Sequence, residues 1–345
     1  MTLPPRRSRL GIGIVGLGMV AATHARALLE LTDLVEVVGV FSPSEARRAE
    51  FAARFGFPVA SSLEALVADQ RVDIVLCLTP PNARAEVARL CVAAGKHALM
   101  EKPLERTLAA ASGIVELFEA ADLRLGTVLQ YRFRESSQRL RGILQSRSYG
   151  ALASAHATVP WWRPQSYYDV AGRGSYARDG GGVMITQALH LLDLLLWLCG
   201  DVSRVQASFR RTSVHRLESE DFVVAGIDFA SGAVGSVVAT TADYPGFPES
   251  ITLNFERGSA RLEGGNLQVW PHDGPAETWG ESSGTGGGAD PMAFPHGWHR
   301  STIEDFILAV REGREPVTTG RDSLKVLGVI EAMKRSSDEG RTIEL

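Results

Sequence analysis

Short, uniformly apolar runs recur through the first 130 residues and alternate with longer amphipathic segments. The runs are too short for helices and too uniform for half-exposed strands, so we predict strands that are buried on both faces of a sheet. Ser44 and Gly95 stand where a helix N-cap and the residue just past a helix end are expected. The alternation of strand and helix predicts an α/β fold with a doubly wound parallel sheet. The first predicted strand begins at residue 10, and the others cover 34–41, 73–78, 97–100 and 125–129, with a weaker run near 59. Helices are predicted at 44–55, in a segment that ends at 94, and at 107–121.

The pattern changes near residue 130. The second part of the chain contains β-rich runs that are separated by Gly, Pro and Asp at hairpin distances, which predicts an open, largely antiparallel sheet. Residues 160–179 are irregular and rich in aromatic residues and Arg. The Gly/Ser-rich stretch 280–288 follows no buried strand, so we interpret it as a flexible loop. Strands are expected at 151–159, 202–212, 221–229, 233–241, 250–255, 260–263 and 267–270, and helices at 136–145, 182–199, 299–312 and 322–337.

Composition limits the class of protein. A chain of 345 residues is long for one core and predicts two domains. The net charge of -4 argues against a nucleic-acid partner. The longest apolar helix, 189–199, is too short to span a bilayer, and residues 1–9 resemble no signal peptide. Three scattered cysteines without a C-x-x-C motif are typical of free thiols in a reducing cytoplasm, where we expect the protein.

Residues 16–21, Gly-Leu-Gly-Met-Val-Ala, lie between the first apolar run and the first helix. This is the G-x-G-x-x-A pattern of dinucleotide-binding turns. Gly16 permits the tight turn, Gly18 lets the main chain approach a pyrophosphate, and Ala21 lets the helix lie close to the strand. The alternative is a glycine-rich turn without a ligand, but the order strand, turn, helix favours a Rossmann domain.

The loops that follow the parallel strands are expected to border the cofactor. The second strand is followed by Ser42 and Ser44, and no carboxylate stands there to bind a ribose 2′-hydroxyl. Arg47 could contact a 2′-phosphate, so we expect NAD(P) with NADP favoured over NAD, although Arg47 on a solvated helix face is equally consistent with the spacing. The predicted cofactor-binding residues are Gly16, Gly18, Met19, Val20, Ser42, Arg47, Thr79, Pro80, Glu101, Lys102 and Gln130.

Two residues have the chemistry of acid–base catalysis. Lys102 stands at the carboxyl end of a short strand and can stabilise or relay charge from a substrate hydroxyl. The predicted helix after Gly182 places Gln187, His190 and Asp193 on one face, where Asp193 could hold the imidazole tautomer. The alternative is a buried structural histidine. We expect no metal site, because Gln is a weak ligand and no Cys or further His is near.

The irregular segment carries aromatic side chains beside arginines, an arrangement that suits a polyhydroxylated ring. A domain or subunit contact is the alternative. The run His296–His299 is interpreted as structural, with a role in lining the site or binding a metal ion as the alternative. The predicted substrate-binding residues are Lys102, Arg132, Trp161, Trp162, Arg163, Tyr167, Arg173, Gln187 and His190.

Together these motifs resemble the Gfo/Idh/MocA oxidoreductase family. The resemblance rests on the glycine turn followed by His24, Thr79-Pro80, Glu101-Lys102-Pro103, the glycines 180–182 with His190 and Asp193, and the closing run 317–324. It implies a Rossmann domain at 1–130 and a substrate-binding and oligomerisation α/β domain at 131–345, and it leaves open whether the last helix packs back on the first domain.

The resemblance also implies that Lys102 and His190 are the catalytic pair and that Lys102-Pro103 is a cis peptide. It departs at Gln187, where many members have Asp, and at Arg84, where a His often stands.

We therefore expect a homo-oligomeric, dimeric or tetrameric, sugar dehydrogenase or reductase with a small carbohydrate substrate and no membrane partner. A glycosidase that oxidises its sugar transiently and a non-catalytic nucleotide sensor are the alternative hypotheses.

Overall fold

The computed structural model describes residues 9–280, 286–288, 290, 292 and 294–345. Parts of the segments 1–9 and 280–288, on which the sequence made predictions, lie outside the described residues. The chain divides into two compact units. The first comprises Met1–Glu105, Ala109–Val128 and His296–Arg321, and the second Arg106–Leu108, Leu129–Pro295 and Asp322–Leu345.

The first unit contains, in its described part, a parallel five-stranded sheet in the order β2-β1-β3-β4-β5. β1 lies between β2 and β3, so the strand order reverses beside it, and ligands of such sheets bind at the carboxyl ends of the strands near that point. The predicted parallel sheet is confirmed, but the weak run near Val59 contributes only an isolated bridge to Val40. The strands are Leu10–Val15 (β1), Val35–Phe41 (β2), Ile74–Cys77 (β3), His97–Met100 (β4) and Leu125–Thr127 (β5).

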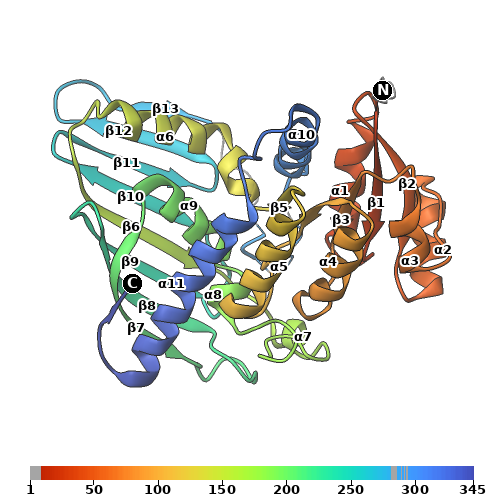
Figure 1. Cartoon of the computed structure of the whole chain (residues 1–345). Coiled ribbons are helices and arrows are strands. Elements are labelled where there is room, and N and C mark those ends of the chain that lie inside the picture. The colour runs from red at the N-terminus through yellow and green to blue at the C-terminus, as the bar shows by residue number, and fades with distance from the viewer. Residues whose placement is uncertain (1–8, 281–285, 289, 291, 293) are drawn as a thin grey trace. The chain divides into compact units, whose positions relative to one another are not determined.

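Helices pack around this sheet (Figure 1). The sequence pattern predicted these helices apart from Leu63–Ala68. Ser44 caps its helix through its side-chain oxygen, as expected. The helices are Ala21–Leu29 (α1), Glu45–Phe55 (α2), Leu63–Ala68 (α3), Arg84–Ala93 (α4), Leu108–Ala120 (α5) and Gly297–Glu312 (α10), with a 3₁₀ turn at Pro81–Ala83 (η1).

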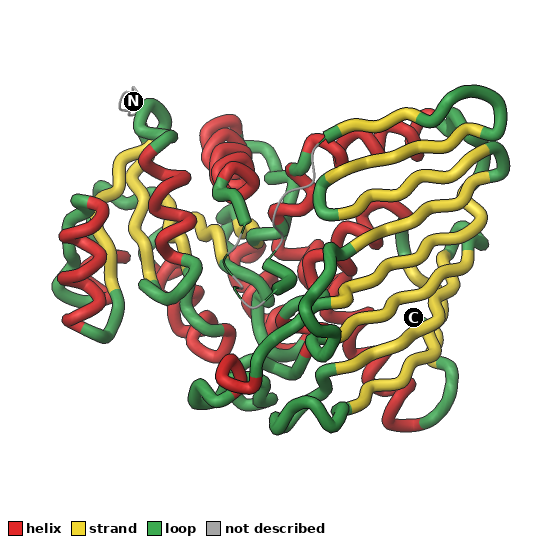
Figure 2. The backbone as a smooth tube through the Cα atoms, turned by 180° about the vertical axis from the view of Figure 1, so that it is seen from behind, coloured by secondary structure: helices red, strands yellow, loops and turns green. Residues whose placement is uncertain are grey.

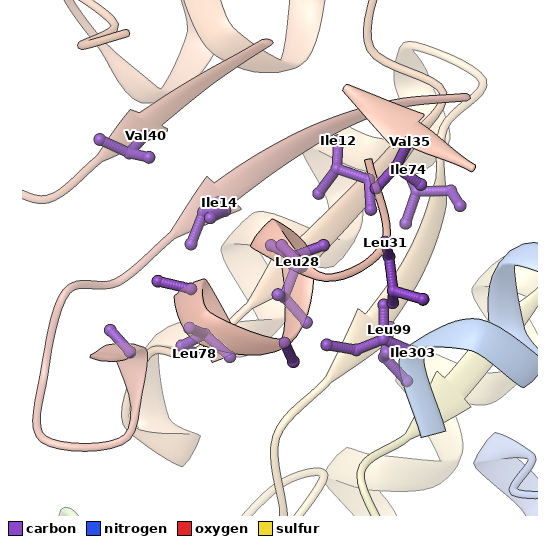
Figure 3. Close-up of a cluster of buried hydrophobic side chains, with 14 of the residues drawn as sticks. Ile12, Ile14, Leu28, Leu31, Val35, Val40, Ile74, Leu78, Leu99 and Ile303 are labelled. Carbon is purple, nitrogen blue, oxygen red and sulfur yellow. The ribbon is translucent and has the colours of Figure 1, made fainter. Parts of the chain in front are cut away.

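The core of the first unit forms between the sheet and the helices α1 and α10. Figure 3 shows Ile12 and Ile74 from the strands close to Leu28 at the end of α1. Ile303 of α10 belongs to the same cluster and is buried. Helix α10 is therefore part of the first unit, which differs from a single domain boundary at residue 130.

The second unit is built on a nine-stranded sheet among the described residues, in the order β13-β12-β11-β10-β6-β9-β8-β7-β14. All neighbours pair antiparallel except β6 and β9, so the predicted largely antiparallel sheet is confirmed. The strands are Leu152–Pro160 (β6), Val202–Arg210 (β7), Phe222–Phe229 (β8), Val234–Thr240 (β9), Ser250–Phe255 (β10), Gly258–Glu263 (β11), Asn266–Pro271 (β12), Glu277–Trp279 (β13) and Ile343–Glu344 (β14).

Helices lie on one face of this sheet, and Figure 2 shows the opposite face without a helix over it. Burial alternates along β8, as a sheet covered on one side requires. The helices of this unit are Glu135–Ser146 (α6), Gln165–Tyr168 (α7), Val183–Thr186 (α8), Leu189–Cys199 (α9) and Gly320–Glu339 (α11), with a 3₁₀ turn at Gln130–Phe133 (η2).

The helix predicted at 182–199 is two helices, α8 and α9, that meet at Gln187 and Ala188. The glycines ahead of it do allow a close approach, as expected. A Cβ on Gly182 would lie 1.8 Å from the Glu220 carbonyl oxygen. No helix of the described residues is long and apolar enough to cross a membrane.

Candidate functional site

The glycine turn of the first unit has the geometry of a phosphate-binding turn. Gly16 has φ +98°, and a Cβ there would lie 2.7 Å from the Leu78 carbonyl carbon. A Cβ on Gly18 would meet nothing within 4 Å, so the main chain at this point borders open space. Helix α1 begins at Ala21 without a side-chain cap or a carboxylate in its first turn. These features fit a dinucleotide pyrophosphate at the positive end of a helix dipole.

The end of β2 presents cations and hydroxyl groups but no carboxylate. Ser42 is buried, and its carbonyl accepts a hydrogen bond from Arg48 Nη1 at 2.5 Å. Arg47, the predicted 2′-phosphate ligand, has an exposed side chain. Ser44 is committed to capping α2. Sequence reasoning assigned no role to Arg48, which stabilises this loop.

Arg84 holds the turn that carries Lys102. Its buried guanidinium donates to the carbonyls of Glu101 and Pro103, to the Lys102 carbonyl at 3.5 Å, and to the Thr79 carbonyl at 2.8 Å. Burial lowers the pKa of Arg84. The Lys102-Pro103 peptide is cis, as the resemblance implied. Arg84 thus connects the Thr79-Pro80 loop to the turn after β4.

The Glu101 side chain holds the other side of this turn. Its carboxylate accepts from His24 Nε2 at 2.8 Å through Oε1 and from the Lys102 backbone N–H at 3.0 Å through Oε2. Burial opposes ionisation, but the hydrogen bond from His24 and the nearby positive charges lower the pKa of Glu101 below its usual range. Glu101 was predicted to bind the cofactor, but its carboxylate is engaged within the protein.

His299 completes a buried cluster with His24 and Glu101. Burial, followed by the His24 charge, lowers the pKa of His299 to about 3, so this imidazole is neutral. The side-chain atoms that these three residues could offer to a metal ion lie within 4.8 Å of one another. Two ligands of a tetrahedral zinc ion would stand roughly 3.3 Å apart, given zinc–ligand bonds of about 2.0 Å. The shorter 2.8 Å contact between His24 and Glu101 is that of a hydrogen bond.

In the second unit, His190 lies near the start of α9 and is buried. Its ring stacks on Tyr131 at 5.0 Å between centroids, and its Nε2 lies 3.4 Å from Gln130 Nε2. The contact brings the Gln130 amide group to the edge of the imidazole. Gln130, predicted to bind the cofactor, is buried in η2 of this unit.

Asp193 does not hold the His190 tautomer, and that prediction is wrong. Its oxygens accept from Arg132 Nε at 2.9 Å and from Arg132 Nη2 at 2.5 Å. Arg132 also contacts Asp322 at 3.1 Å. Burial raises the pKa of Asp193, and the Arg132 charge opposes that shift. Arg132 was predicted to bind substrate, but these two carboxylates occupy its guanidinium.

The aromatic segment places its predicted residues in two different environments. Trp161 and Arg163 are buried, and Arg163 donates to the carbonyls of Gly286 and Gly288 at 2.7 and 2.6 Å. Arg163 therefore ties the segment 286–288 to the strand end. Tyr167 is only partly buried and accepts a hydrogen bond from Gln187 Nε2 at 3.3 Å.

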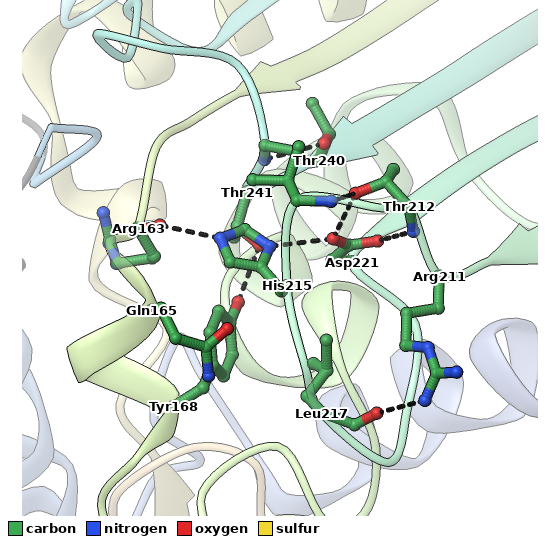
Figure 4. Close-up of polar contacts among 12 residues, drawn as sticks. Arg163, Gln165, Tyr168, Arg211, Thr212, His215, Leu217, Asp221, Thr240 and Thr241 are labelled. Carbon is green, nitrogen blue, oxygen red and sulfur yellow. Dashed lines mark hydrogen bonds and ion pairs between the residues drawn. The ribbon is translucent and has the colours of Figure 1, made fainter.

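Sequence reasoning missed His215, which fixes this segment (Figure 4). Its Nδ1 contacts Asp221 Oδ2 and its Nε2 contacts the Arg163 carbonyl, both at 2.8 Å. The two ring nitrogens thus join the Asp221 carboxylate to the backbone of the aromatic segment. Tyr168 Oη lies 2.6 Å from Thr241 Oγ1 in the same cluster. The signal was hidden because His215 is 52 residues from Arg163.

The glycine turn and the parallel sheet define a dinucleotide-binding oxidoreductase fold, and comparison with known proteins agrees. Residues 10–128 match the family model described as an oxidoreductase family with an NAD-binding Rossmann fold. Residues 137–261 match the GFO/IDH/MocA C-terminal domain. The chain belongs to the GFO/IDH/MocA family.

Similar proteins cover nearly the whole chain. D-apiose dehydrogenase of Paraburkholderia graminis is 25% identical over 96% of this chain and 88% of its own. Myo-inositol 2-dehydrogenase of Thermotoga maritima is 25% identical over 97% and 98%. Among solved structures, the WlbA dehydrogenase of Chromobacterium violaceum, in complex with NADH and UDP-GlcNAcA, is 30% identical with a TM-score of 0.87, over 100% of this chain and 98% of that one.

Proposed function

We propose that the protein is an NAD(P)-dependent oxidoreductase that transfers a hydride between nicotinamide and a hydroxyl-bearing carbon of a sugar or sugar derivative. The observation that carries this proposal is the Lys102 turn, held on one side by Arg84 and on the other by Glu101. Buried contacts that hold the main chain on both sides of one lysine are expected where the ammonium group of that lysine must be positioned for catalysis. The named activities of the relatives, apiose and inositol dehydrogenases, support a polyhydroxylated substrate.

The proposed chemistry divides between the residues of this chain. The glycine turn with Met19 and Val20 and the Thr79-Pro80 loop bind the dinucleotide, which when bound supplies the hydride acceptor or donor. In the oxidative direction, the hydroxyl proton passes to His190 Nε2 as the hydride leaves the carbon. Lys102 stabilises the negative charge that develops on the oxygen. The reverse direction returns the same proton.

The substrate contacts are proposed for the exposed part of the aromatic segment. Trp162 and Tyr167 offer partly buried aromatic faces, and Gln187 offers an amide beside Tyr167. An apolar C–H face of a sugar packs on such rings while the hydroxyl groups take hydrogen bonds. These contacts would determine which carbon is oxidised.

NADP is proposed over NAD as the preferred cofactor. The support is the carboxylate-free end of β2 and the exposed Arg47. A carboxylate there would select the ribose 2′-hydroxyl and repel a 2′-phosphate. Titration of the protein with NADPH and NADH should give the lower Kd for NADPH. A lower Kd for NADH would contradict this preference.

A cytoplasmic homo-oligomer is the proposed state of the protein. The three cysteines are free and buried, which suits a reducing compartment. The helix-free face of the nine-stranded sheet carries exposed valines, Val224 and Val234. An exposed apolar sheet face is typical of a surface that pairs with a second copy.

A substrate panel tests the activity itself. The purified protein is mixed with NAD⁺ or NADP⁺ and with D-apiose, myo-inositol, levoglucosan or UDP-GlcNAcA, and the formation of reduced nicotinamide is followed. We expect at least one member to be oxidised. Binding of dinucleotide with no turnover of any member would favour the nucleotide-sensor hypothesis.

A further inference from the structure

Two arginines lie beside one tyrosine in the second unit. The Arg173 guanidinium carbon is 4.3 Å from the centroid of the Tyr167 ring, and that of Arg163 is 5.5 Å away. Gln187 donates from Nε2 to the Tyr167 hydroxyl at 3.3 Å. We call Arg163, Tyr167, Arg173 and Gln187 the Tyr167 cluster. It brings together two positive charges and two neutral hydrogen-bonding groups.

No carboxylate among the described residues balances the charge of the Tyr167 cluster. Within the described residues, neither Arg163 nor Arg173 forms an ion pair with a carboxylate. Arg163 donates to backbone carbonyls, and the buried Nε atoms of both arginines have no hydrogen-bond partner among the described residues. Two cations brought together without a counter-charge cost free energy, most of all where they are removed from water.

The other buried arginines of this unit show a different arrangement. Arg132 pairs with Asp193 and Asp322. Arg134 pairs with Glu249 at 3.0 Å. Carboxylates of this unit therefore neutralise Arg132 and Arg134. The lack of such a carboxylate at Arg173 among the described residues points to a counter-charge from outside the described chain.

We propose that the Tyr167 cluster binds an anionic oxygen group of the substrate, and specifically the carboxylate of a sugar acid. This inference rests on the proposed function and gives its substrate a chemical class. A guanidinium can bind a carboxylate through two parallel hydrogen bonds. The Tyr167 hydroxyl accepts from Gln187 and keeps its own hydrogen to donate to the same anion.

Arg173 is the member of the cluster best suited to reach this anion. Arg163 is buried and committed to the carbonyls of Gly286 and Gly288. Arg173 is only partly buried, and no side-chain hydrogen bond of its guanidinium is found among the described residues. Arg163, 5.5 Å from the ring centroid, then contributes its charge, and Arg173, 4.3 Å from the centroid, contributes the direct contact.

A set of four probes separates the chemical sources of the anion. D-glucose and D-glucuronate differ by one carboxylate, and UDP-glucose and UDP-glucuronate repeat that difference on a nucleotide diphosphate. The Kd of each is measured by titration of the full chain saturated with NADH. We expect the carboxylate to lower Kd by about 10-fold or more in both pairs, as one charge-assisted bidentate contact provides.

Substitution of Arg173 assigns that difference to the cluster. Arg173→Gln should abolish the preference for the carboxylate, so that the Kd of each sugar acid approaches the Kd of its neutral partner. Arg216→Gln removes an exposed arginine of the same unit and should leave the preference intact. The melting temperature of both variants shows whether they are folded, and Arg173→Lys should restore only part of the preference because lysine lacks the planar fork.

Four results would overturn the inference. The first is an equal loss of affinity for both members of a pair in Arg173→Gln. The second is a preference of the wild-type protein for the neutral sugars. The third is a loss of affinity in Arg173→Gln that is confined to the two UDP compounds, which would show that the cluster binds the diphosphate. The fourth is binding of none of the probes. Oxidation of neutral sugars alone would leave the proposed function standing, whereas failure of the proposed function would be seen as a lack of turnover with every substrate.

Discussion

At the residue scale, the molecule concentrates buried polar contacts around Lys102. The Lys102 backbone N–H is bound by Glu101, and its carbonyl faces Arg84. The sequence predicted Lys102 from its position at a strand tip. It could not predict the side chains that hold the Lys102 turn. His24, which binds the Glu101 carboxylate, is 77 residues from Glu101 in sequence, and Arg84, which binds the Glu101 carbonyl, is 17 residues from it. Such contacts depend on how the strands and helices pack.

The neutral imidazole of His299 makes stability depend on pH. Its pKa falls from the ordinary 6.5 to about 3 on folding, because the ring is buried and lies near His24. Below pH 6.5 the unfolded chain therefore binds a proton that the folded chain does not, and the free energy of unfolding falls as the pH is lowered toward 3. This single group accounts for a slope of up to about 1.4 kcal/mol per pH unit.

The measurement is the free energy of unfolding in urea at several pH values between 6.5 and 4. His299→Leu should flatten the dependence, whereas His272→Leu, at an exposed position, should leave it unchanged. An unaltered slope in His299→Leu would show that other groups cause the acid sensitivity.

At the element scale, hydrophobic patterning predicted most strands and helices, because a buried strand and an amphipathic helix differ in their apolar period. It missed the short strands β13 and β14 and the helix α3. It failed where tertiary contacts decide the structure. The predicted helix 182–199 breaks at Gln187. Gly182, which precedes the first of the two helices, lies against the Glu220 carbonyl. Helix α10 follows the second unit's sheet in sequence but packs in the first unit's core, and no local pattern indicates that.

The η1–α4 segment positions the Lys102 turn through Arg84, and this can be tested. Arg84→Lys keeps the charge but cannot donate to the carbonyls on both sides of the turn. Since a displacement of about 1 Å can cost roughly 100-fold in rate, we expect kcat to fall by about 10- to 100-fold with KM and the Kd for the dinucleotide nearly unchanged.

The matched control is Arg89→Lys, an exposed position on the same helix, which should behave as wild type. A parallel rise of KM and the dinucleotide Kd in Arg84→Lys would indicate a general structural role instead.

At the scale of the whole molecule, the sequence predicted two parts with different sheets, since β/α alternation stops near residue 130. The predictions for Arg132 and Arg163 show what residue type alone cannot provide. Arg132 and Arg163 look alike in sequence to Arg173, yet the first binds carboxylates and the second binds carbonyls. Burial and partners separate these arginines, and neither can be obtained from residue type.

The helix-free sheet face predicts assembly. Val224→Glu places a charge on this face, where Val224 is 41% exposed, and should shift the protein from oligomer to monomer in light scattering. Val59→Glu, at a similarly exposed valine of the first unit, should keep the wild-type mass. A Val224→Glu protein with the wild-type mass would place the interface elsewhere.

The central claim is that Lys102 and His190 act on one substrate that is bound with the dinucleotide. The most direct measurement compares the rate of hydride transfer and the dinucleotide Kd in Lys102→Ala, in His190→Ala and in the control Lys325→Ala, an exposed lysine. The account predicts that the first two variants lose about 100-fold or more of the rate, with the dinucleotide Kd within a few-fold of wild type, and that the control loses neither. Wild-type rates in either Lys102→Ala or His190→Ala would contradict it.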